Sequence, residues 1–217
     1  MGERGWQTAD LSILESLAGP GSLRWTPLRR HFGITAYGVN AYTAQEAGQD
    51  VVETHTEKTN GHEELYLVLA GRALFHLDDE ELDAPVGTLV FVHDPSVQRS
   101  ASAAESGTTV LAIGGKPGIH ETSEWEYSFG AYGYHAANET ERVLDLLREG
   151  LEKRGESPRL LYDLACLESL SGQHDKALVH LRRAIEVDER YRDMAHGDSD
   201  FDSIRNDRQF PPKSGKR

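Results

Sequence analysis

Cysteine, methionine and long apolar runs are scarce in this chain. Its 217 residues include 1 cysteine and 2 methionines. A single cysteine cannot form an internal disulfide, and without a cysteine cluster there is no thiolate zinc site. No run approaches the roughly 18 consecutive apolar residues that a membrane span needs. The charged start, MGERGWQTAD, is not expected to be a signal peptide or an anchor, so we expect a cytoplasmic protein.

Basic residues are also few. Lysine and arginine total 23 against 36 aspartates and glutamates, which gives a net charge of -13. This charge repels phosphate backbones and anionic lipid headgroups, so we expect no nucleic-acid partner and no membrane partner. Residues 1–135 carry 19 acidic and 8 basic residues, a balance of -11, and residues 136–217 carry the remaining -2. A ligand of the first part is therefore expected to be cationic or neutral rather than multiply anionic.

Short apolar runs separated by Gly, Pro, Asn and Asp fill residues 23–115, among them ITAYGVNAYTA and ELYLVLAG. Such runs, repeated roughly every 8 to 12 residues, predict an all-β sandwich or barrel. We assign residues 23–135 to this domain, with EWEYSFGAYGY as an aromatic connector that packs against it. Residues 1–22 form an N-terminal extension, in which TADLSILESLAG predicts a short helix capped near Thr8 or Asp10.

Helical periodicity begins after residue 136. Asn138 and Glu141 have the spacing of a capping box at the start of a first helix. A helical hairpin follows, in which Ser157 is a candidate cap, Pro158 suits the first helical position and Gly172 can end the first helix in a left-handed conformation. Residues 136–217 are therefore expected to form an all-α domain with a C-terminal cap.

The β part contains a sequence that is typical of one fold family. Glu64 is followed, seven residues later, by Gly71 in EELYLVLAG. In residue types and spacing this segment resembles the first motif of the cupins, which places two histidines before the glutamate. The cupin fold is a double-stranded β-helix or jelly roll. A hairpin loop three residues longer than usual puts His55 and Glu57 at the two histidine positions, with His62 inside the loop.

The second cupin motif is matched in spacing and altered in residues. The family's proline, glycine, histidine and asparagine positions are occupied by His93, Pro95, Gln98 and Ser102. The ligand histidine of the family is thus Gln98, and an amide oxygen is a weaker ligand than imidazole for a divalent transition metal. The resemblance implies the fold over roughly residues 30–115. Because cupins include dioxygenases, isomerases, storage proteins and sensor domains, it does not select a function.

A metal site is one interpretation of these residues. His55 and Glu57 alternate along a strand and share a face, and antiparallel pairing can place Glu64 opposite them. With Gln98 they would form a mixed nitrogen and oxygen shell that suits Fe, Mn, Ni or Zn. The alternative is a solvated hairpin tip rich in polar residues. His62 is open to two interpretations, a substitute ligand or a group that caps the loop.

Tyr66 and His76 are the candidates for contact with a ligand. His76, in RALFHLDD, lies on a predicted strand whose alternation can point it into the barrel, and a hydrogen-bonded core histidine explains it equally well. The sequence contains no nucleophile elbow of the G-x-S-x-G kind and no phosphate-binding loop. The chemistry of the barrel therefore depends on the histidines and carboxylates near Glu64.

The hairpin from Pro158 to Asp188 resembles one tetratricopeptide repeat. With Ala177 as the alanine of the second helix, the other signature positions are Leu161, Leu164, Ala165, Gly172, Leu181 and Ala184. Repeat arrays usually need about three units to bury a continuous core, so this short array must be covered by the barrel, a second copy or a partner. The resemblance implies protein docking or self-association, and we expect a homodimer.

Three functions are compatible with this organisation. The first is a cupin that binds a small molecule, with or without a metal, and carries a helical module for protein docking or self-association. The second is a metal-dependent cupin enzyme, an oxygenase or isomerase, in which the metal acts as Lewis acid or oxygen activator. The third is a dimerisation scaffold without catalysis. The sequence leaves open whether the protein is an enzyme and does not name a substrate.

Overall fold

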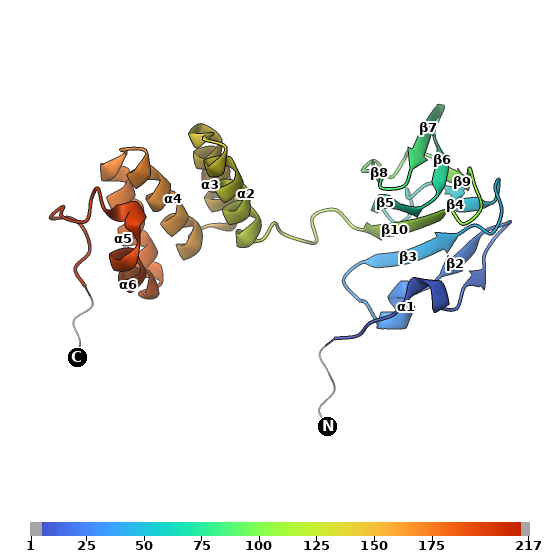
Figure 1. The fold of residues 1–217 in the computed structure, drawn as a ribbon, viewed down its shortest axis with the longest axis horizontal. Helices are drawn as coiled ribbons and strands as arrows, with labels where there is room; N and C mark the ends of the chain where they lie inside the picture. Colours follow the sequence, from blue (N-terminus) through green and yellow to red (C-terminus); the bar gives the residue numbers. More distant parts are fainter. Residues whose placement is uncertain (1–5, 214–217) are drawn as a thin grey trace, which may run out of the picture. The chain divides into compact units, whose positions relative to one another are not determined.

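The chain divides into two compact units. The computed structural model describes residues 6–213. The first unit, Met1–His120, consists mainly of strands and the second, Glu121–Arg217, of helices (Figure 1). The sequence placed the boundary after residue 135, and the structure places it earlier because the aromatic segment forms a helix of the second unit. Within the described range, the helices are too short or too polar to cross a membrane.

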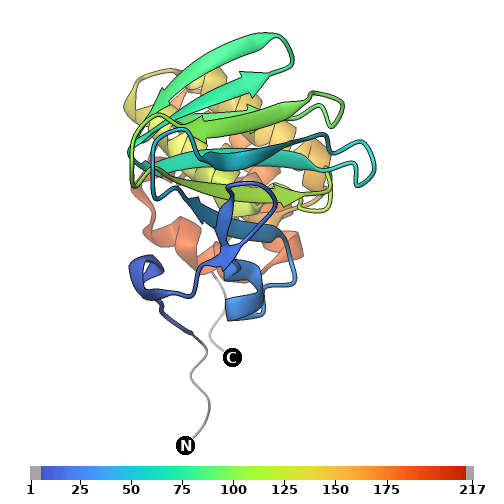
Figure 2. The same cartoon turned by 90° about the vertical axis from the view of Figure 1, so that its right-hand side faces the viewer.

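Two antiparallel sheets make up the first unit, and their strands lie across the view in Figure 2. The larger sheet has the order β1-β2-β3-β10-β5-β8 and the smaller has the order β4-β9-β6-β7. This arrangement confirms the predicted β-sandwich of jelly-roll type. The elements are β1 (Leu17–Ala18), β2 (Arg24–Thr26), α1 (Leu28–Phe32), β3 (Gly38–Thr43), β4 (Asp50–His55), β5 (Glu63–Ala70), β6 (Arg72–Leu77), β7 (Glu80–Pro85), β8 (Leu89–Val92), β9 (Arg99–Ala103) and β10 (Thr109–Gly115).

The core of this unit lies between the two sheets. Phe75 from the smaller sheet and Tyr66 from the larger are both fully enclosed, and their rings lie 5.6 Å apart. Along β5, Tyr66 and Val68 are buried, and Glu64 shares their face because side chains two apart in a strand point the same way. The carboxylate of Glu64 is therefore carried on the core-facing side of the sheet.

The turn between β5 and β6 explains why Gly71 ends the sequence motif. Its φ is +69°, a left-handed conformation that side chains rarely adopt. A Cβ atom at this position would lie 2.6 Å from Thr108 Oγ1 and 2.8 Å from Thr108 Cα. Glycine is therefore required both by the backbone conformation and by the close approach of Thr108.

The N-terminal extension differs from the predicted short helix. Only Leu11–Ile13 form a turn of 3-10 helix, η1, and Leu17–Ala18 pair with β2 as strand β1. The expected cap is present, since the Asp10 side chain accepts a hydrogen bond from the Ser12 backbone N–H at 2.9 Å. Residues 1–5 of the predicted extension lie outside the described residues.

The second unit consists of five α-helices and one short 3-10 helix in the described range. They are α2 (Glu124–Ala136), α3 (Thr140–Arg154), α4 (Pro158–Leu170), α5 (His174–Val187), α6 (Arg190–Gly197) and η2 (Ser199–Phe201). Helix α2 replaces the predicted aromatic connector. Its Tyr127 is buried among α3 and α4 residues such as Leu147 and Leu160, and a Cβ atom on Gly150 would lie only 2.9 Å from the Tyr127 ring. Glycine at position 150 therefore allows α2 to pack closely on α3.

The helical hairpin forms much as the sequence predicts. Ser157 Oγ accepts a hydrogen bond from the Leu160 N–H at 3.3 Å, Pro158 is the first residue of α4, and Gly172 has φ +77° after that helix ends. The predicted capping box is not formed, because Asn138 has φ +60° and α3 begins only at Thr140 without a side-chain cap. The expected all-α region is therefore present, with one helix start displaced.

Candidate functional site

The end of β4, the loop after it and the start of β5 bring three predicted residues together. His55 is the last residue of β4, Glu57 lies in the loop, and Glu64 is the second residue of β5. One ligand atom from each of the three lies within 4.8 Å of the others, a grouping that could hold a metal ion. The predicted antiparallel pairing of these two strands is not formed, because β4 pairs with β9 in the smaller sheet and β5 pairs with β10 and β8 in the larger. The three residues therefore meet where the loop passes from one sheet to the other.

A buried arginine completes this cluster. Glu64 Oε2 accepts hydrogen bonds from Tyr66 OH at 2.5 Å and from Arg99 Nη1 at 3.0 Å. Arg99 is 0% exposed, and its Nη2 donates to the backbone oxygens of Asp94 at 3.1 Å and Val97 at 2.9 Å. The guanidinium is therefore held in place by the backbone and directed at the carboxylate.

His55 faces oxygen acceptors on both sides of its ring. Nδ1 lies 2.7 Å from the backbone oxygen of Glu53, and Nε2 lies 3.3 Å from Glu64 Oε2 and 3.9 Å from Glu57 Oε1. Only a doubly protonated imidazolium can donate at both nitrogens. The hydrogen bond to Glu64 accordingly raises the pKa of His55, against the opposing effect of burial.

Burial and hydrogen bonding fix the charge states around Glu64. Burial raises the pKa of Glu64, but the hydrogen bonds from His55, Tyr66 and Arg99 outweigh it and hold the pKa at about 2. Burial and the neighbouring Glu64 carboxylate raise the pKa of Tyr66, and burial is also the main cause that raises the pKa of Tyr42 to about 12. At neutral pH the site thus contains one carboxylate at its centre and two neutral phenols.

A small cavity of about 260 Å³ opens onto this cluster. Three acidic side chains contribute to its wall, and two tyrosines and two apolar residues close the remaining sides. The lining residues are Tyr42, Val52, Glu53, His55, Thr56, Glu57, Glu64, Tyr66 and Ala112. Such a cavity can bind a small polar molecule through its carboxylate and phenol groups.

The remaining predicted residues lie outside the cavity. Gln98 is exposed, and its backbone N–H donates to Asp78 Oδ1 at 2.8 Å. His76 is exposed and lies 3.9 Å from Glu81, so it does not point into the barrel as one interpretation expected. His62 is not among the residues that line the cavity, and its Nδ1 lies 3.6 Å from Glu57 Oε2.

Arg99 is the site residue that sequence reasoning missed. The second motif pointed to Gln98, and the strand turns the neighbouring residue inward instead. A one-residue shift along a strand moves a side chain to the other face. The signal was present in the alternation of Arg99, Ala101 and Ala103, which are all buried on one face of β9.

The donor set does not fit a resident divalent metal. The contact of His55 Nδ1 with a backbone oxygen does match the way metal-ligating histidines are oriented. However, Glu64 Oε2 already has three partners, one of them the permanent cation of Arg99. A metal ion bound to that oxygen would lie beside a buried guanidinium, and like charges repel strongly in a site of low dielectric constant.

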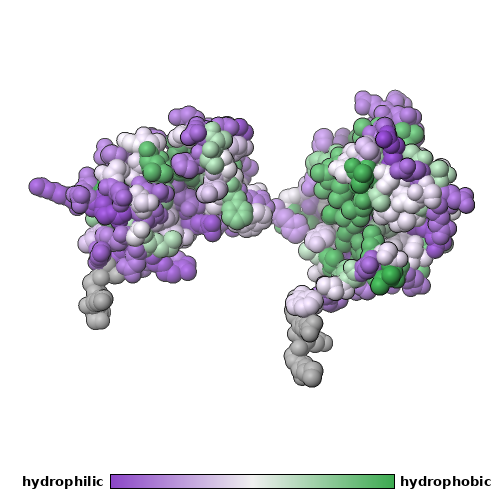
Figure 3. Space-filling model, viewed as in Figure 1, coloured by the Kyte–Doolittle hydropathy of each residue, from purple (hydrophilic) through white to green (hydrophobic). Residues whose placement is uncertain are grey.

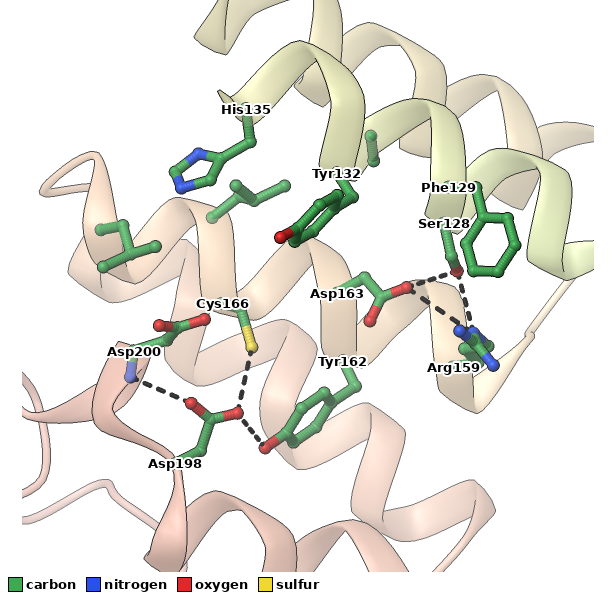
Figure 4. A pocket seen from close by; sticks show the side chains of 13 residues that line it. Ser128, Phe129, Tyr132, His135, Arg159, Tyr162, Asp163, Cys166, Asp198 and Asp200 are labelled. Carbon is green, nitrogen blue, oxygen red and sulfur yellow. Dashed lines mark hydrogen bonds and ion pairs between the residues drawn. The ribbon is translucent and has the colours of Figure 1, made fainter. Parts of the chain in front are cut away.

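The helical unit has a separate cavity of about 610 Å³ between α2, α4 and the segment around η2 (Figure 4). On one side, Asp163 accepts a hydrogen bond from Ser128 Oγ at 2.5 Å, and Ser128 Oγ accepts one from Arg159 Nε at 2.9 Å. Phe129 and Tyr132 are 65% and 77% exposed and contribute aromatic rings to the wall. The cavity thus combines polar groups with accessible aromatic surface.

The other side of this cavity holds the chain's one cysteine. Asp198 Oδ2 accepts hydrogen bonds from Tyr162 OH at 2.8 Å and from Cys166 Sγ at 3.8 Å, and one ligand atom from each of Cys166, Asp198 and Asp200 lies within 4.8 Å of the others. Burial and the neighbouring aspartates raise the pKa of the Cys166 thiol. The thiol is therefore a poor nucleophile at neutral pH.

Comparisons with known proteins find only distant structural likenesses. No family model matches the chain, and no curated protein matches it. Among solved structures, a cupin protein from Bacteroides fragilis is 22% identical, with 57% of this chain and 94% of that chain covered and a TM-score of 0.46. A sugar phosphate isomerase of the cupin superfamily from Silicibacter pomeroyi is 17% identical, with 51% and 76% covered and a TM-score of 0.42. Both of these proteins are described as cupins, and at these values the likeness does not extend to activity.

Proposed function

We propose that the β unit is a cupin that binds a small molecule in the cavity beside Glu64. The observation that carries this proposal is the network of Glu64, Tyr66 and Arg99, which holds the cavity wall in one arrangement. A site whose polar groups are already ordered loses little entropy when a ligand binds. The cavity of about 260 Å³ suits a molecule smaller than a typical drug. Binding there does not depend on Fe, Mn, Ni or Zn.

The lining favours a ligand that donates hydrogen bonds. Glu53, Glu57 and Glu64 supply carboxylate oxygens, which only accept. A small polyhydroxylated or amine-bearing molecule satisfies these acceptors, whereas a phosphate or a second carboxylate would be repelled. The excess of acidic residues in the first 135 positions adds to this preference.

The proposal is tested by thermal-shift screening with small polyols and small amines, followed by titration calorimetry of each compound that stabilises the protein. Ligand at about 100 times its Kd should stabilise the folded protein by about 2.7 kcal/mol. Glu57→Gln should weaken binding because it removes a charged acceptor from the cavity wall, whereas His76→Ala, on the outer face, should leave it unchanged. Equal binding by both variants would show that the ligand lies elsewhere.

Proton transfer is a second candidate activity for the same cavity. His55 is a proton donor when it is an imidazolium, and Glu57 Oε1, 3.9 Å from its Nε2, is an acceptor on the same wall. An acid and a base on one wall can isomerise a hydroxylated substrate by moving a proton. An isomerase is therefore better supported than an oxygenase, which requires a metal that this donor set does not fit. Turnover that His55→Ala abolishes and His76→Ala retains would establish it.

We further propose that the β unit pairs with a second copy through the outer face of its larger sheet. Apolar side chains gather there over β5, β8 and β10 (Figure 3). Leu89 and Phe91 are 62% and 56% exposed, and a sheet that is apolar on both faces needs cover on both. Sedimentation should show a dimer that Phe91→Glu dissociates and the control Val179→Glu, at an exposed site on α5, does not. A monomer at all concentrations would refute the pairing.

For the helical unit we propose a docking role like that of a tetratricopeptide hairpin. The cavity beside α2 offers the exposed rings of Phe129 and Tyr132 and the carboxylate of Asp200, which suit a partner segment with a basic side chain. Fluorescence anisotropy with labelled Lys-rich and Glu-rich peptides tests this preference. Tyr132→Ser should weaken binding of the Lys-rich peptide, and Val179→Ser should not. Binding of the Glu-rich peptide alone would contradict it.

A further inference from the structure

Arg99 lies on β9, the strand that pairs with β4 at the site. In the pairing of β4 with β9, Arg99 is the direct partner of His55. Side chains of directly paired residues lie next to each other on one face of the sheet. A metal-ligating residue from β9 would therefore have to come from position 99, since Gln98 is exposed.

The hydrogen bonds of Arg99 direct its positive charge at Glu64. The side chain is fully buried, yet it forms hydrogen bonds only through its two terminal nitrogens, and Nε has no partner among the described residues. Nη2 is fixed by two backbone oxygens, which leaves Nη1 directed at Glu64 Oε2. An arginine kept in the interior with an unpaired Nε is costly unless its charge is needed there.

Without the guanidinium of Arg99, the Glu64 carboxylate would be a largely buried anion with no permanent counter-ion. It lies on the core-facing side of β5 with a side chain that is 15% exposed. In a metal-binding arrangement a divalent ion would neutralise such a carboxylate. Here the guanidinium contacts Glu64 Oε2, the same carboxylate oxygen that lies 3.3 Å from His55 Nε2.

We propose that Arg99 is a built-in cation that takes the place of a divalent metal, and that the residue at position 99 decides whether this barrel binds metal. The guanidinium neutralises Glu64, occupies its Oε2 atom and repels a metal ion from that oxygen. An imidazole at position 99 would remove all three effects and add a nitrogen ligand beside His55.

The experiment titrates Zn²⁺, Ni²⁺ and Mn²⁺ into the full chain by calorimetry and measures bound metal by mass spectrometry after dialysis. Wild-type protein should bind no metal at this site. Arg99→His should bind close to one equivalent, with Zn²⁺ or Ni²⁺ affinity raised about 10-fold to 100-fold. Adding His55→Ala to Arg99→His should abolish that gain, whereas adding His76→Ala, outside the site, should retain it.

Two results would overturn the inference. One is near-stoichiometric metal in the wild-type chain that is lost in His55→Ala. The other is an Arg99→His protein with wild-type circular dichroism and no gain in affinity. If Arg99→His does not fold, the wild-type titration with its His55→Ala control still decides the matter. Metal binding is measured without any small-molecule ligand, so its outcome is independent of whether the proposed cavity binds one.

Discussion

Replacing Glu64 by glutamine should destabilise the β unit by about 3 kcal/mol. The amide keeps the shape of the side chain and can still accept hydrogen bonds from Tyr66 and Arg99, but it removes the charge that neutralises the buried guanidinium. The pKa of Glu64 is about 2 instead of 4.5, and each unit of pKa corresponds to about 1.4 kcal/mol in favour of the carboxylate. Removing one partner of a buried ion pair costs about 3–5 kcal/mol, which agrees in size.

Urea denaturation followed by tryptophan fluorescence measures this loss. In a Trp125→Phe background the remaining tryptophans, Trp6 and Trp25, both belong to the first unit, so the signal reports on that unit. The matched control is Glu63→Gln, the neighbouring residue of β5, which points to the opposite face of the strand. A loss below about 1 kcal/mol for Glu64→Gln, or an equal loss in the control, would refute the assigned role of the buried pair.

Three further outcomes are expected. Because the folded-state pKa of Glu64 lies below its usual value, its stabilisation of the folded state by about 3 kcal/mol should be present above pH 4.5 and be lost as the pH falls towards 2. Urea titrations at each pH measure this loss, and Glu64→Gln should not show it. Gly71→Ala should cost at least about 2 kcal/mol because its Cβ would clash with Thr108, more than Gly61→Ala, where φ is +64° but no atom lies within 4 Å. Ser157→Ala should cost the helical unit about 1 kcal/mol, measured by circular dichroism during thermal unfolding, and an unchanged midpoint would contradict the assigned cap.

Local signals predicted most of the fold. The left-handed Gly172 after α4, the short apolar run that forms β5 and the Ser157 cap each depend on a few neighbouring residues, so the sequence shows them directly. The aromatic segment was misassigned because Trp125, Tyr127 and Phe129 alternate as in a strand, and two glycines within it lower helix propensity. Its helix is stabilised by tertiary packing of Tyr127 beside Gly150, which no local pattern shows.

The candidate site was predictable around the connection from β4 to β5 and not on β9. The spacing of the first motif brings His55 and Glu64 together across one loop, although β4 and β5 lie in different sheets and do not form the antiparallel pair that we predicted. The contribution of β9 depends on its register against β4, where the pairing shifts between Val52 and His55. That irregularity is invisible in the sequence, and the one-residue difference between Gln98 and Arg99 decides whether an amide or a guanidinium enters the site.

The burial of Cys166 makes site-specific labelling of this protein simple. The residue is 8% exposed, and the raised pKa of its thiol leaves little thiolate to react with a maleimide. A cysteine introduced at the exposed loop residue Thr59, close in sequence to Thr56 and Glu57 of the cavity wall, would be labelled selectively without removal of the native thiol. A fluorophore at that position would report ligand entry into the barrel directly, in the otherwise unaltered chain.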